Sequence, residues 1–161
     1  MNKGLKRLTI IGVLLVLTWT TIWVINYAWY IDKAYGYEKL PDTYYKYEEG
    51  YSYTVRCPHY FSLTGNFAIS NSDCTVAILI WPNYLKNKQY EDYKFGISIL
   101  DTKTNMGYRF YSDISGNFVE MKNEKYNATE KKIIAELIYR YEDEIKILFN
   151  LAEKEWKGEK K

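Results

Sequence analysis

An uninterrupted apolar segment near the amino terminus limits what this chain can be. The 24 residues from Leu8 to Ile31 include no Asp, Glu, Lys, Arg, His or Pro. As a helix rising about 1.5 Å per residue, the segment is roughly 36 Å long, enough to cross a hydrocarbon core of about 30 Å. A helix also pairs its own backbone N–H and C=O groups, as hydrocarbon requires. The segment therefore predicts a transmembrane helix over residues 8–31.

The charges on the two sides of this segment differ. Before it stand Lys3, Lys6 and Arg7, with no acidic residue among them. After it, positive and negative charges balance as far as Lys39. Because cytoplasmic flanks carry the excess of Lys and Arg, we expect the amino terminus in the cytoplasm and everything after Ile31 outside. The prediction is a single-pass protein of the cell membrane.

A cleaved signal peptide is the alternative to an uncleaved signal anchor. Its cleavage site would need small residues at positions −3 and −1. The nearest candidates, Thr18-Trp19-Thr20 and Asn26-Tyr27-Ala28, fit poorly, so we expect the helix to remain as an anchor. Asn26 is the one strongly polar residue in the segment. We expect it near the outer interface, hydrated by water and without a function of its own.

The length of 161 residues leaves room for one compact domain after the anchor, and not comfortably for two. Residues 32–50 are rich in Tyr and lack apolar periodicity, so we expect a juxtamembrane linker there. The predicted organisation is a cytoplasmic stub (1–7), a transmembrane helix (8–31), this linker (32–50) and an extracytoplasmic domain (51–161).

Charge argues against a nucleic-acid partner. The chain has 22 Lys and Arg against 20 Asp and Glu, and three of the cations belong to the stub. The outer part is therefore nearly neutral, without the basic excess that attracts phosphate backbones. We expect the membrane and an envelope component as partners, and no nucleic acid.

The outer domain shows strand patterns followed by a helix pattern. Residues 51–57 alternate between apolar and polar, and 74–81 form the continuous apolar run typical of a central strand buried on both faces. Further strands are expected over 61–70, 95–100, 108–111 and 118–121. After an N-cap at Asn127, apolar residues recur at spacings of three and four to about residue 157. The predicted fold class is α+β, an antiparallel sheet packed by a long C-terminal amphipathic helix. The alternative for that helix is a partner-binding or membrane-surface face.

Few residues are candidates for chemistry. Cys57 and Cys74 form the candidate disulfide, because an even number of cysteines outside the cytoplasm is compatible with one bridge. His59 is the single histidine, so a four-ligand zinc site cannot be assembled from His and Cys alone. We also find no P-loop or glycine-rich dinucleotide motif. The expectation is therefore no metal, no cofactor and no catalytic residue.

These observations predict a membrane-anchored, non-enzymatic binding or accessory module of the cell envelope. The surfaces we would test for a partner are the tyrosines of the linker and the exposed face of the sheet. The alternatives are a small envelope thiol enzyme that uses Cys57 or Cys74 with His59, and a membrane-bound immunity or sensor protein.

Overall fold

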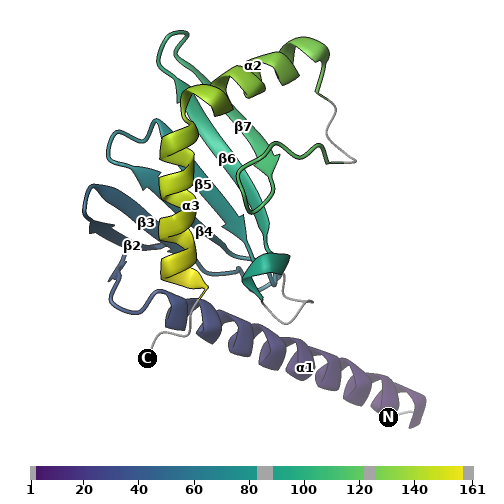
Figure 1. Cartoon of the computed structure of the whole chain (residues 1–161). Helices are drawn as coiled ribbons and strands as arrows, with labels where there is room; N and C mark the ends of the chain where they lie inside the picture. The colour runs from purple at the N-terminus through teal and green to yellow at the C-terminus, as the bar shows by residue number, and fades with distance from the viewer. Residues whose placement is uncertain (1–2, 83–88, 122–125, 158–161) are drawn as a thin grey trace.

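The computed structural model describes residues 3–82, 89–121 and 126–157. Its described part consists of a long apolar helix, a seven-stranded antiparallel sheet and two carboxyl-terminal helices, which confirms the α+β class (Figure 1). In chain order the elements are α1 (Lys3–Lys33), β1 (Glu38–Lys39), β2 (Tyr44–Glu48), β3 (Tyr51–Arg56), β4 (Asn66–Asn71), β5 (Val76–Trp81), the 3-10 helix η1 (Tyr90–Asp92), β6 (Lys94–Asp101), β7 (Met106–Ser112), α2 (Ala128–Arg140) and α3 (Glu142–Trp156).

The sheet is a meander in which each strand pairs antiparallel with the next one in the chain. It begins earlier than the sequence pattern indicates, because β1 and β2 lie within residues 32–50, where a linker is expected. Lys46 of β2 ties this segment to the helical layer, since its Nζ lies 3.3 Å from Glu155 Oε2 of α3 and 4.8 Å from the centre of the Tyr53 ring. Part of the predicted linker is therefore sheet.

Strand alternation gives the sheet two different faces. One face carries fully buried apolar side chains, and α3 packs across it with Leu148, Ala152 and Trp156 (Figure 1). The buried strand residues with no exposed surface are Val55, Phe67, Ile69, Val76, Ile78, Ile80, Ile97 and Ile99. On the opposite face the side chains of β5 remain half-buried. The predicted central strand over 74–81 is thus β5 (Val76–Trp81), and it is completely buried on one face only.

The predicted C-terminal helix is divided at Tyr141. The capping box at the start of α2 is present, with Asn127 and Glu130 each accepting from the other's backbone N–H. At Tyr141 the backbone leaves helical geometry (φ −109°, ψ 18°), and α3 starts in a new direction over the sheet (Figure 1). Arg140 Nη1 lies 2.6 Å from Asp101 Oδ1 at the end of β6. This ion pair holds the junction of the two helices against the sheet.

Helix α1 projects from the end of the sheet opposite to α2 (Figure 1). By length and composition it could span a membrane over Lys6–Lys33. Its amino-terminal part is exposed, whereas Tyr30 near its other end is 1% exposed and packs on Phe67 with ring centres 5.4 Å apart. The carboxyl-terminal end of α1 is therefore part of the core of the domain.

Asn26 corrects one expectation from the sequence. Its side chain is 1% exposed, and its Nδ2 donates a hydrogen bond to the backbone carbonyl of Leu63. A buried amide that pairs with a loop carbonyl holds that loop in place. Asn26 is thus a contact between helix and domain, and it is not a hydrated surface residue.

Candidate functional site

Two of the sequence-predicted residues, Cys57 and His59, lie together in the segment that leaves β3. They line a cavity of about 120 Å³ between Tyr27 of α1 and residues 39–44, which run from the end of β1 to the start of β2. Cys57 is half-buried and His59 is exposed. The structure therefore brings the thiol and the imidazole to one cavity, next to the base of α1.

Cys74 lies elsewhere, in the turn between β4 and β5, and it is exposed. In the pairing of β3 with β4, Arg56 lies opposite Asn66, so Cys57 and Cys74 are placed at opposite ends of β4. A strand of six residues is roughly 20 Å long, whereas a disulfide needs Cα atoms within about 7 Å. Both cysteines are free, and the predicted disulfide is not supported.

Burial raises the pKa of the Cys57 thiol to about 11, and it outweighs the hydrogen bond with the Tyr27 side chain and the charge of Lys39, which lower it. Nucleophilic cysteines need the opposite shift, because the thiolate is the reactive species. The raised pKa of Cys57 keeps the thiol protonated at neutral pH, and it does not favour the alternative of an envelope thiol enzyme.

The first prediction concerns this thiol. In a C74S chain at pH 8, we expect Cys57 to react with iodoacetamide on the order of a hundredfold more slowly in the folded protein than after unfolding in urea, because the thiolate fraction falls with the raised pKa. The folded rate should then rise about tenfold per pH unit up to pH 10. Equal rates in the folded and unfolded chain would contradict the prediction.

No group of three or more His, Cys, Asp and Glu side chains that could hold a metal ion occurs among residues 3–82, 89–121 and 126–157. Asp73, Asp101 and Asp113, the acidic residues of three turns, have local hydrogen-bond partners. Asp113, for example, accepts hydrogen bonds from the backbone of Ser115 and Asn117, which holds the pKa of its carboxyl below the usual range. The Asp113 carboxylate thus stabilises the turn over residues 113–117.

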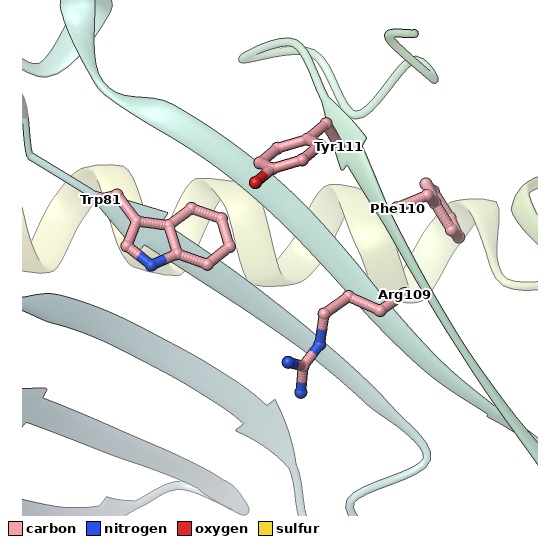
Figure 2. A pocket seen from close by; sticks show the side chains of 4 residues that line it. All are labelled: Trp81, Arg109, Phe110 and Tyr111. Atoms are coloured by element: carbon pink, nitrogen blue, oxygen red, sulfur yellow. The ribbon is translucent and has the colours of Figure 1, made fainter. Parts of the chain in front are cut away.

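The open face of the sheet carries a second cavity, of about 280 Å³, at its β5–β7 side. Trp81, Arg109 and Tyr111 line it from this face, while the adjacent Phe110 points toward the core and is 2% exposed (Figure 2). The indole of Trp81 and the phenol ring of Tyr111 have centres 5.8 Å apart. Two aromatic rings and a guanidinium group thus border one hollow.

The register of the strands explains why these side chains meet. Gly96 of β6 lies opposite both Leu79 of β5 and Tyr111 of β7, so the side chain missing at Gly96 leaves space between two occupied strands. The Trp81 indole fills part of that space: a Cβ added to Gly96 would lie 3.0 Å from its Cζ3 atom. Gly96 thereby lets the indole lie flat across the sheet.

Sequence reasoning identified the exposed sheet face as a surface to test but did not single out these residues. Trp81 ends a run that reads as continuously buried, and the pairing of Gly96 with Tyr111 depends on register, which one sequence does not reveal. The available signal was a glycine inside a strand, which often marks a close approach.

None of the family models, curated proteins or solved structures compared with this chain matches it.

Proposed function

We propose that this chain is a single-pass membrane protein whose outer domain is a non-enzymatic binding module for a protein of the cell envelope. The proposed topology places the amino terminus in the cytoplasm. It follows from Lys3, Lys6 and Arg7 ahead of the candidate span and from the balanced charges behind it. The observation that carries the binding role is the cavity bordered by Trp81, Arg109 and Tyr111 on the open face.

The chemistry of this cavity supports a protein partner. Trp, Tyr and Arg are the residues most enriched among those that dominate binding energy at protein interfaces. The aromatic rings offer rigid apolar area, and an exposed guanidinium group can pair with a carboxylate of the partner. Arg109 is exposed, while Trp81 and Tyr111 are half-buried, so their rings are already held in place before a partner arrives. Such preorganisation lowers the cost of binding.

The second prediction tests this role in living cells. With the photoreactive amino acid benzoylphenylalanine at Tyr111, irradiation should yield one cross-linked protein adduct, and adding R109A should remove most of it, at least tenfold if the guanidinium group contributes as interface arginines do. Benzoylphenylalanine at Tyr139 of α2, which is 81% exposed, is the matched control. The absence of an adduct at position 111, or the same adduct from position 139, would contradict the binding role.

The topology has its own test. In a C57S chain, the exposed Cys74 should react in intact cells with a maleimide that does not cross membranes. Reaction only after the cells are opened would mean that the domain lies in the cytoplasm, and the proposed envelope partner would then be wrong.

A further inference from the structure

One face of α1 is bonded to the loop between β3 and β4. Trp19, Trp23, Asn26 and Tyr30 are spaced by four, three and four residues, so they share one face of the helix. The Nε1 groups of Trp19 and Trp23 donate hydrogen bonds to the carbonyls of Tyr60 (2.9 Å) and Pro58 (3.3 Å). Polar groups on this face of the apolar helix therefore hold residues 58–65.

Distances along the axis of α1 give the depth of this loop relative to the apolar segment. Trp19 follows Leu8 by 11 residues, which corresponds to about 16 Å along the axis, only about half of a 30 Å hydrocarbon core. Tyr27 lies about 12 Å further along, near the outer boundary, and the charged side chains Lys39 and Asp42 line a cavity with it. Charged side chains of the domain thus lie at the height of Tyr27, while Tyr60, which is hydrogen-bonded to Trp19, lies roughly 10 Å deeper.

The composition of the loop suits an apolar surrounding. Residues 58–65, PHYFSLTG, contain no Asp, Glu, Lys or Arg. Phe61 is 89% exposed, although the adjacent Tyr60 packs on Trp23 with ring centres 5.4 Å apart. Phe61 therefore extends from the loop beside the apolar helix α1. Its side chain is exposed to the same surroundings as that helix.

The backbone of the loop is bonded within the protein at several points. The carbonyls of Pro58, Tyr60 and Leu63 accept from α1 side chains, and the Gly65 N–H donates to the Tyr30 hydroxyl over 2.9 Å. Within the loop, Ser62 N–H donates to the His59 carbonyl. Irregular backbone is tolerated at membrane depth where it is buried against protein or faces a water-filled cavity. These hydrogen bonds hold the backbone of the loop against α1 and leave the Phe61 side chain on the outside.

We propose that residues 58–64 form a membrane-inserted loop, with Phe61 buried in the outer leaflet among the acyl chains next to α1. The inference rests on the proposed function, because it requires α1 to span the bilayer. Lipid is the occupant that the geometry favours, since the loop is hydrogen-bonded to a stretch of helix that lipid would surround. The outer domain is then seated in the membrane surface and holds its open face at a fixed height, instead of swinging on a linker.

The third prediction tests the insertion by photo-cross-linking to lipid. The full chain, with benzoylphenylalanine at Phe61, is reconstituted in phosphatidylethanolamine–phosphatidylglycerol vesicles that contain a phospholipid with an alkyne-tagged acyl chain. The same substitution at Leu14, exposed on α1, is the positive control, and at Tyr139 it is the negative control. We expect a lipid adduct at position 61 at least tenfold stronger than at position 139 and comparable with that at position 14.

The outcomes separate the two proposals. A lipid adduct at position 14 but not at position 61 overturns the inserted loop and leaves the membrane span intact. A cross-link from position 61 to a second copy of the chain, without lipid, overturns it as well and identifies a different occupant. The absence of lipid adducts at both positions overturns the span itself.

Discussion

Replacing Trp156 by alanine is expected to lower the free energy of unfolding by about 3–5 kcal/mol, the range for removing a large aromatic side chain from a core. Trp156 is 1% exposed at the end of α3. Its indole stacks on Phe67 with ring centres 5.0 Å apart and an interplanar angle of 18°, and it meets the edge of Tyr53 at 6.1 Å. Since Phe67 also contacts Tyr30 of α1, this indole lies where α3, the sheet and α1 come together.

Urea unfolding of the full chain in detergent micelles, followed by circular dichroism, measures this effect. The matched control is W156F, which keeps an aromatic ring against Phe67 and leaves a smaller cavity, so it should cost less than half as much. If the alanine variant lost less than about 1 kcal/mol, the contact between α3 and the sheet would not be the core of the domain.

The sequence alone predicts the parts of the fold that depend on local periodicity. The apolar run 8–31 corresponds to α1 and the alternation over 51–57 to β3. The spacing of apolar residues after Asn127 corresponds to the two helices α2 and α3. The division at Tyr141 was not predictable in this way, because the apolar spacing continues through it and the bend depends on packing against the sheet and on the pair Arg140–Asp101. Tertiary contacts decided the boundary.

The candidate sites illustrate the same limit. Cys57 and Cys74 look pairable by count, but strand register separates them, and register depends on contacts far apart in the chain. The strands β1 and β2 could not be predicted, because the tyrosines of residues 38–48 give no clean alternation. In addition, Lys46 pairs with Glu155, more than a hundred residues away in the chain. Trp81 and Tyr111 meet for the same non-local reason.

The substitution G65A is expected to disrupt the junction between α1 and the domain. Gly65 is buried where the loop enters β4, and a Cβ there would lie 2.1 Å from the Arg56 carbonyl oxygen and 2.8 Å from Tyr30 Cε1. The carbonyl cannot move away easily, because Arg56 is paired with Asn66 in the sheet. We therefore expect a loss of about 3 kcal/mol or more, at the upper end of the cost of overpacking.

A matched glycine separates this clash from the general effect of adding a methyl group to a strand. Gly107 of β7 has open space around its Cβ position, so G107A should change the free energy of unfolding by no more than about 0.5 kcal/mol. Cys57 reports locally on the same junction: its alkylation at pH 8 should accelerate in G65A and stay slow in G107A, because loosening the loop from Tyr30 also uncovers the thiol beside Tyr27. Equal stability of the two variants would show that the loop does not approach Arg56 and α1 this closely, and that Gly65 does not fix α1 to the sheet.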